Sequence, residues 1–199
     1  MFVFSGDDTY ESYNAAKGYL AQLSKNTNLP IKIVNPDDVK NINDLLYSLE
    51  SIDIFGESSI IFAKRIFDNK DIANYFAENI DKSKDLNLVV WLDKPLDGKT
   101  KLSKVLTQTS LVKSFDAPRL GELIEWIKKK SAELGINLSS EIINFLVENV
   151  TNDKWVIESE LNKLIIIDKL KPTLKEIKEI FGLTVKGDIW KFVDYVGNR

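Results

Sequence analysis

The first residues whose types and spacing could support chemistry follow a short apolar N-terminal segment. Residues 1–5 (M-F-V-F-S) predict a buried β-strand, and Gly6-Asp7-Asp8-Thr9 follows where a helix would begin. A phosphate-binding loop at such a junction has the pattern G-x-x-x-x-G-K-[ST], whose backbone N–H groups and Lys bind phosphate and whose hydroxyl binds Mg²⁺. Only Gly6 of that pattern is present. Asp7 and Asp8 would repel a phosphate, whereas Asp8 suits the N-cap of a helix that starts at Thr9.

Composition excludes further kinds of active site. The 199-residue chain has no Cys and no His, so thiolate zinc sites, Cys nucleophiles and histidine general bases are excluded. We expect no cofactor and no metal site, because Asp7 and Asp8 are better explained as helix-capping residues than as metal ligands. A net charge of −3 argues against nucleic-acid binding by bulk charge alone. With no apolar run of membrane-spanning length and no evident signal peptide, we expect a cytoplasmic protein without a membrane partner.

The first half of the chain alternates predicted strands and helices. Besides residues 1–5, strands are predicted over 30–35, 58–62, 86–92 and 111–115, and helices over 9–25, 42–49, 70–80 and 102–106. This alternation predicts an α/β domain over residues 1–117, with a largely parallel five-stranded sheet flanked by helices. The segment 86–92 is the most apolar of the strands, and we expect it to be central in the sheet.

The second half is predicted to be entirely helical. Helices are expected over 120–134, 140–150, 153–170 and 173–181, which together predict an all-α bundle over residues 118–183. Ser139 and Thr173 are the expected N-caps of two of these helices, and Glu176 completes a capping box with Thr173. Residues 184–199 contain a further amphipathic segment. It can be the first helix of another domain, or an ordinary C-terminal helix packed on the bundle.

Charged residues in this half are expected to be solvated. Lys128-Lys129-Lys130, and likewise Lys99, Lys101 and Lys104 in the first half, predict exposed basic helix faces. Glu158 and Glu160 are expected to form surface ion pairs, which contribute little each. The apolar positions expected in the core of the third helix of this half are Leu161, Leu164, Ile165 and Ile167.

Several segments resemble, in the same order, the delta subunit of the bacterial DNA polymerase III clamp loader. Residues 52–61 (I-D-I-F-G-E-S-S-I-I) resemble its segment with an apolar residue, Phe and Gly or Ala before a strand. Residues 88–94 (L-V-V-W-L-D-K) resemble its fourth strand, and residues 99–106 (K-T-K-L-S-K-V-L) resemble the "K-L-x-K-x-L" helix that follows. Residues 123–136 and 158–164 resemble its two lid motifs, and residues 192–194 (F-V-D) resemble the start of its collar domain. The resemblance covers essentially the whole chain.

The resemblance implies an AAA+-like α/β domain without a functional P-loop over residues 1–117, a helical lid over 118–183, and the first helix of a truncated collar domain over 184–199. It implies a non-catalytic subunit of the DNA polymerase III holoenzyme, a nucleotidyltransferase. During DNA replication this subunit binds the sliding clamp (the beta subunit) and opens it for loading on primed DNA. The implied partners are the clamp, the other clamp-loader subunits, and primed DNA through the assembled complex. Ile54 and Phe55 match the apolar pair that inserts into a hydrophobic pocket of the clamp.

Two further departures from active AAA+ modules agree with an inactive subunit. Where those modules carry an Asp-Glu pair at the end of the third strand, this sequence has Ala63-Lys64-Arg65. Where their lid offers an Arg to the phosphates, it has Trp155. Three alternatives remain open from the sequence: Ile54 and Phe55 can fold back onto the sheet, the chain can be a degenerate AAA+ scaffold for another partner, or it can be a nucleotide-using α/β enzyme with an unusual site.

Overall fold

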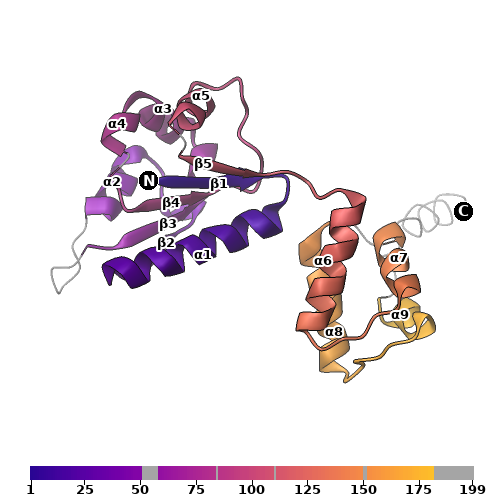
Figure 1. Cartoon of the computed structure of the whole chain (residues 1–199). Helices are drawn as coiled ribbons and strands as arrows, with labels where there is room; N and C mark the ends of the chain where they lie inside the picture. The colour runs from indigo at the N-terminus through magenta and orange to yellow at the C-terminus, as the bar shows by residue number, and fades with distance from the viewer. Residues whose placement is uncertain (51–57, 84, 110, 150–151, 182–199) are drawn as a thin grey trace, which may run out of the picture. The chain divides into compact units, whose positions relative to one another are not determined.

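The chain forms two compact units, Met1–Ala117 and Pro118–Arg199. A computed structural model describes residues 1–50, 58–83, 85–109, 111–149 and 152–181 (Figure 1). Each unit has its own hydrophobic core.

The first unit is built on a parallel five-stranded sheet with the strand order β2-β3-β4-β1-β5. The strands are β1 (Phe2–Gly6), β2 (Ile31–Val34), β3 (Ile60–Lys64), β4 (Leu88–Trp91) and β5 (Val112–Phe115). In the register of the sheet, Val3 of β1 lies opposite Val90 of β4 and Val112 of β5. The predicted α/β class and parallel sheet are confirmed, and β4 is an inner strand as expected.

Helices supply the crossovers that parallel strands require. They are α1 (Thr9–Thr27), α2 (Ile42–Glu50), α3 (Lys70–Glu78), α4 (Ile80–Ser83) and α5 (Lys101–Gln108), with 3-10 turns at Pro36–Asp38 and Ile66–Asp68. The single helix predicted over 70–80 is divided between α3 and α4. Asn79 leaves the helical conformation with a φ of −119°, and both its backbone N–H and its side-chain amide donate to the carbonyl of Tyr75.

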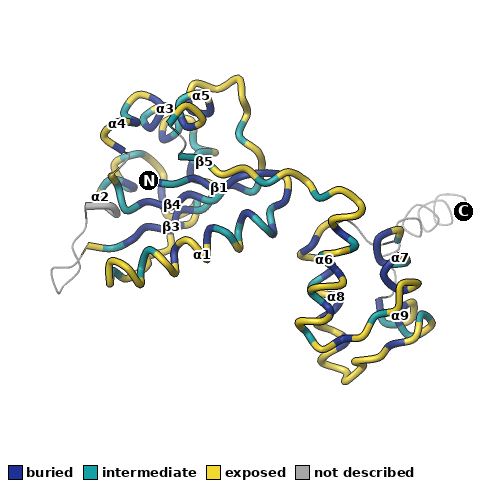
Figure 2. The backbone as a smooth tube through the Cα atoms, in the orientation of Figure 1, coloured by how far each residue is buried: buried dark blue, intermediate teal, exposed yellow. Residues whose placement is uncertain are grey.

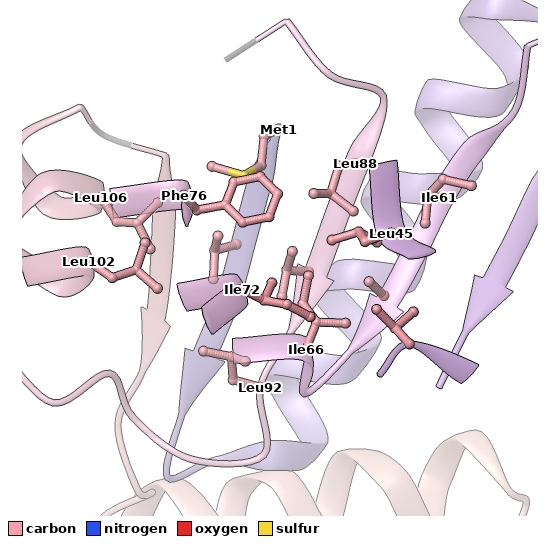
Figure 3. Packing of buried hydrophobic residues seen from close by; sticks show 14 of the residues in the cluster. Met1, Leu45, Ile61, Ile66, Ile72, Phe76, Leu88, Leu92, Leu102 and Leu106 are labelled. Atoms are coloured by element: carbon pink, nitrogen blue, oxygen red, sulfur yellow. The ribbon is translucent and has the colours of Figure 1, made fainter. Parts of the chain in front are cut away.

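The side chains of the sheet alternate between two core layers, as the two-residue period of a strand requires. On one face, Phe4, Ile60, Phe62 and Val89 pack under α1 with Ala16 and Leu20. On the other face the larger cluster includes Val3, Ile61 and Val90 and is covered by α2, α3 and α5. Figure 3 shows part of this cluster, with Phe76 and Ile72 beside residues of the sheet. The inner strands are accordingly buried along their length (Figure 2).

The second unit is all-α in its described part. Its helices are α6 (Leu120–Glu133), α7 (Ser140–Asn149), α8 (Lys154–Ile166) and α9 (Leu174–Ile180). Both predicted caps are present: the Ser139 hydroxyl accepts from the N–H of Ile142 at 3.3 Å, and the Thr173 hydroxyl accepts from the N–H of Glu176 at 3.3 Å.

The end of α8 corrects the expected core. Leu161 and Leu164 are fully buried as predicted, but Ile165 and Ile167 are 39% and 47% exposed. Adjacent helical positions are rotated by about 100° from each other, so Ile165 leaves the face that Leu164 buries. The helix also ends at Ile166, and Asp168 turns the chain with a φ of +56°. The longer helix predicted over 153–170 was therefore wrong at its C-terminal end.

Tertiary contacts also correct the expectation of solvated charges in this unit. Lys130 of α6 pairs with Glu158 of α8 at 2.5 Å, and only 19% and 23% of the two side chains are exposed. Glu160 is buried and pairs with Lys163 at 2.7 Å. Lys128 and Lys129 are exposed as predicted. The basic run is thus divided, because only Lys130 lies on the side of α6 that faces α8.

The capping box of α9 predicts an acid-sensitive contribution to stability. The ammonium of Lys169, together with the N–H and hydroxyl of Thr173, lowers the pKa of Glu176 to about 2. A carboxyl group with a lowered folded-state pKa stabilises the fold above its unfolded pKa, and this contribution is lost as the pH falls through the folded value. We therefore expect Glu176→Gln to flatten the stability profile of this unit between about pH 4.5 and 2. Thermal melting across that range checks this, with Glu179→Gln, an exposed glutamate on the same helix, as the control.

Candidate functional site

The connection between β1 and α1 occupies the place where a phosphate loop would lie. Since β1 ends at Gly6 and α1 begins at Thr9, only Asp7 and Asp8 join them. The Asp8 carboxylate accepts from the N–H of Glu11 at 3.0 Å, as the predicted N-cap should, and the Asp8 N–H donates to the carbonyl of Phe115 at 3.1 Å. Anion sites at helix N-termini depend on N–H groups that point at the ligand. Here a buried carboxylate already occupies that position.

Gly6 itself has a structural reason to be glycine. Its φ is +143°, which side-chain-bearing residues rarely adopt. A Cβ at this position would lie 2.0 Å from the carbonyl oxygen of Phe115 on β5. The glycine is therefore required for the close approach of β1 and β5, independently of any phosphate.

The carboxyl end of β3 carries cations where Mg²⁺ ligands would be needed. The Lys64 ammonium lies 5.7 Å from the ring centroid of Tyr13, and Arg65 donates through Nη1 to the Asp93 carboxylate at 3.3 Å. Arg65 also has a φ of +52°, and its N–H donates to the carbonyl of Trp91. Among the residues that the structure describes, no group of three His, Cys, Asp or Glu side chains could hold a metal ion.

An aromatic contact at the end of β4 joins α1 to the same edge of the sheet. The indole Nε1–H of Trp91 donates to the Ser12 hydroxyl at 3.0 Å, and its ring meets that of Tyr13 edge-on at 5.1 Å between centroids. The Ser12 hydroxyl in turn donates to the Thr9 carbonyl at 3.2 Å. The first turns of α1, which face phosphate in a nucleotide-binding module, are here bonded to the sheet. Nothing in the sequence pattern pairs Ser12 with Trp91.

In the second unit, the position expected to carry a lid Arg is an aromatic one. Trp155 is 37% exposed, and its N–H donates to the Asp153 carboxylate at 2.8 Å, which caps α8. The neighbouring Lys154 is buried, with its ammonium 5.5 Å from the ring centroid of Trp126. The cation next to Trp155 in sequence is therefore held against Trp126 inside the unit.

The predicted partner-binding pair falls outside the described residues. Ile54 and Phe55 lie in the segment 51–57, between α2 and β3. Their role in binding a partner therefore stays a prediction.

Lys101, the first residue of α5, lines a groove that the sequence did not indicate. The groove has a volume of about 360 Å³ and is lined by apolar side chains that include Phe67, Leu92 and Leu102. At its rim, Lys94 pairs with Asp68 at 2.6 Å, and this hydrogen bond raises the pKa of Lys94 above its usual value. Lys101 is exposed and pairs with Glu78 at 3.2 Å, and Lys99 and Lys104 are exposed, as predicted.

Solved structures of other proteins are similar in fold to this chain. The solved structure of the Bacillus subtilis DNA clamp loader delta protein (YqeN) is similar to 99% of this chain, with a TM-score of 0.54 and 17% identity. Domain III of the Thermotoga maritima replication initiation protein DnaA is similar to 94% of the chain, and 84% of that domain is covered, with a TM-score of 0.60 and 16% identity. The chain shares the fold of these proteins, an AAA+-like α/β domain followed by a helical unit.

Further comparisons limit how much the shared fold implies about function. The Thermotoga maritima Holliday junction branch migration motor RuvB matches 90% of the chain at a TM-score of 0.57 and 11% identity. Residues 119–179 match the family model of the HP_1247_M middle domain. No curated protein matches the sequence. The chain spans 62% of the length of the clamp loader delta protein and 60% of RuvB. At these identities the likeness establishes the architecture alone.

Membrane insertion receives no support from the helices. In the described part of the chain, none combines the length and the apolar character that a bilayer crossing requires.

Proposed function

We propose that this chain is a delta-type subunit of a bacterial DNA polymerase III clamp loader. One observation carries the proposal: the delta-like motifs occur in order along a chain with an AAA+ fold, whose phosphate-loop position is reduced to Asp7 and a capping Asp8. Residues 118–183 would be its lid, and residues 184–199 the start of its collar. The fold similarity to a clamp loader delta protein over 99% of the chain supports this proposal.

In this role the subunit does no chemistry. It binds the sliding clamp through Ile54 and Phe55, and its binding energy favours the open ring over the closed one. It can shift that equilibrium by no more than its differential affinity for the two states. Other subunits of the loader supply the nucleotide-dependent steps, and primed DNA is met through the assembled complex.

Titration of the purified chain with the sliding clamp of the same organism tests the proposal. Saturable binding of one chain to the clamp is the expected result. If the chain did not bind the clamp, it would be a degenerate AAA+ scaffold for another partner, and the proposed function would be wrong.

We expect nucleotide binding to be negligible. The Asp8 carboxylate occupies the helix N-terminus, the end of β3 carries Lys64 and Arg65, and Trp155 stands in the lid position. Calorimetry with ATP and Mg²⁺ should therefore show no heat beyond dilution, with a nucleotide-binding AAA+ protein as the positive control. A micromolar site would favour the alternative of a nucleotide-using α/β enzyme.

A further inference from the structure

A hollow on the α1 side of the sheet is lined by aromatic side chains. It has a volume of about 360 Å³ and lies between α1 and the strands β1 and β5. Phe2 and Phe4 of β1 and Tyr19 of α1 form its aromatic wall, and Lys113 of β5 stands beside them. We propose that this hollow binds single-stranded nucleic acid, with a base stacked on the aromatic wall. The inference goes beyond the proposed function, in which primed DNA is met through the assembled complex.

The side chains that line the hollow share one face of the sheet. Phe2 and Phe4 belong to the core layer that packs under α1. The ring centroid of Tyr19 lies 5.2 Å from that of Phe2 and 5.8 Å from that of Phe4. Lys113 lies opposite Phe4 in the register of β1 and β5, and its ammonium is 5.3 Å from the ring centroid of Phe115, which packs against the same layer. The wall and the cation therefore form one continuous surface.

The aromatic wall is open to solvent at Tyr19. This side chain is 36% exposed although its ring contacts two other rings, and β5 beside it is an edge strand of the sheet. Every nucleobase has a π-face, so exposed aromatic rings stack bases of any sequence, as they do in proteins that bind single strands. The volume of the hollow is near the lower end of the range for ligand sites, which suits a single base.

The charges around the hollow are complementary to a phosphate backbone. Lys113 is exposed, and so is Lys25, which lies three residues after Gln22 of the hollow and is therefore its neighbour on the helix surface. None of the described residues that line the hollow is acidic. The exposed residues of α1, which is described throughout, include no Asp or Glu either, although the whole chain has 30 acidic residues. The local charge is thus opposite in sign to the net charge of −3.

Gly18 leaves the helix backbone open at this hollow. It lies in the interior of α1, where glycine is less favourable than alanine. A Cβ at this position would meet nothing within 4 Å, so no packing contact requires glycine here. Gly18 also lines the hollow, and a residue without a side chain allows a ligand to approach the backbone closely. Binding in the hollow therefore explains a residue that folding does not require.

A protein surface is a poorer occupant of this hollow. Protein–protein interfaces are depleted in lysine, whereas sites for single-stranded nucleic acid combine aromatic rings with cations. In a symmetric dimer formed through this hollow, the same patch of both copies would meet. Lys25 and Lys113 of one copy would then lie close to the same cations of the other, and like charges brought together oppose association.

Fluorescence anisotropy of a labelled oligothymidylate, titrated with the whole chain at low salt, tests the proposal. We expect saturable binding, and binding about tenfold weaker for Tyr19→Ala, because this variant removes one base–aromatic stack. Tyr19→Phe keeps the ring and should bind like the wild type. The matched control is Tyr47→Ala, which truncates a tyrosine that is 75% exposed on α2, and it should leave the affinity unchanged.

A second variant leaves the aromatic packing untouched. Lys113→Gln removes one exposed positive charge. The slope of log affinity against log salt concentration should become shallower by about 0.7, which is the contribution of one phosphate contact on a single strand. Lys129→Gln, at an exposed position of the second unit, should leave this slope unchanged.

The outcomes separate this inference from the proposed function. A wild-type chain that did not bind the oligonucleotide, or equal losses for Tyr19→Ala and Tyr47→Ala, would overturn the inference. Equal affinity for a duplex of the same length would overturn it too, because paired bases do not stack on a protein ring. None of these titrations needs the clamp. A chain that bound the oligonucleotide but not the clamp would refute the proposed function alone, and the reverse result would refute this inference alone.

Discussion

Replacement of Ile54 and Phe55 by alanine is expected to abolish clamp binding and to leave the fold intact. The two residues are an adjacent apolar pair between α2 and β3, in the position that matches the clamp anchor of delta subunits. Loss of a central aromatic anchor costs about 2 kcal/mol or more of binding free energy. This corresponds to a loss of affinity of roughly thirtyfold or more. Clamp titration measures the affinity, and thermal melting of the same preparation measures the stability of the fold.

The competing explanation, a core role for the pair, gives a different result. Truncation of a buried Phe leaves a cavity and destabilises the fold by about 3–5 kcal/mol. A collapsed melting temperature, or an unchanged clamp affinity, would each refute the assignment. Ile166→Ala, at a position 82% exposed in the second unit, controls for the loss of an exposed aliphatic side chain.

Gly6→Ala is expected to give the largest loss of stability among substitutions at the junction between β1 and α1. The new Cβ would lie 2.0 Å from the carbonyl oxygen of Phe115, and the φ of +143° would be strained for alanine. Both β1 and β5 would have to separate, so we expect a loss of about 3 kcal/mol or more. Thermal melting should show a decrease of about 10 °C or more.

A second glycine provides the matched control. Gly18 lies within α1, and a Cβ there would meet nothing within 4 Å. Gly18→Ala should therefore stabilise the protein by about 0.5–1 kcal/mol, because alanine favours the helix more than glycine does. If Gly6→Ala melted like the wild type, the structural explanation of Gly6 would be wrong.

Local sequence patterns predicted most of the architecture. The period of apolar residues separated five strands from the helices between them, and caps such as Asp8 and Thr173 marked where α1 and α9 begin. These features depend on contacts within a few residues, which is the range over which a sequence pattern is informative. The same locality explains the errors at helix ends, at Asn79 and after Ile166, where a single backbone conformation decides the boundary.

Contacts between distant residues could not be predicted in this way. Trp91 bonds to Ser12, 79 residues away in the chain, and Lys130 of α6 pairs with Glu158 of α8. Neither pair has a spacing that the period of a helix or strand would bring together. The run Lys128-Lys129-Lys130 therefore predicts three solvated side chains, although Lys130 is largely buried against α8. Ile31 and Ile33 of β2 are exposed, which the sequence did not indicate either, because the pattern of a strand does not tell whether a helix covers its apolar face.

The missing nucleotide-binding residues were predictable from the amino-acid sequence, because each belongs to a short local motif. The chain has no His and no Cys, the glycines and Lys of a phosphate loop are missing between β1 and α1, and Lys64 and Arg65 stand at the end of β3 where active AAA+ modules carry an Asp-Glu pair. The contacts that take their place could be found only from the folded chain. The Asp8 N–H bonds to β5, Trp91 bonds to α1, and Gly6 allows β1 and β5 to meet, because parallel strands bring residues from distant parts of the chain to one edge of the sheet.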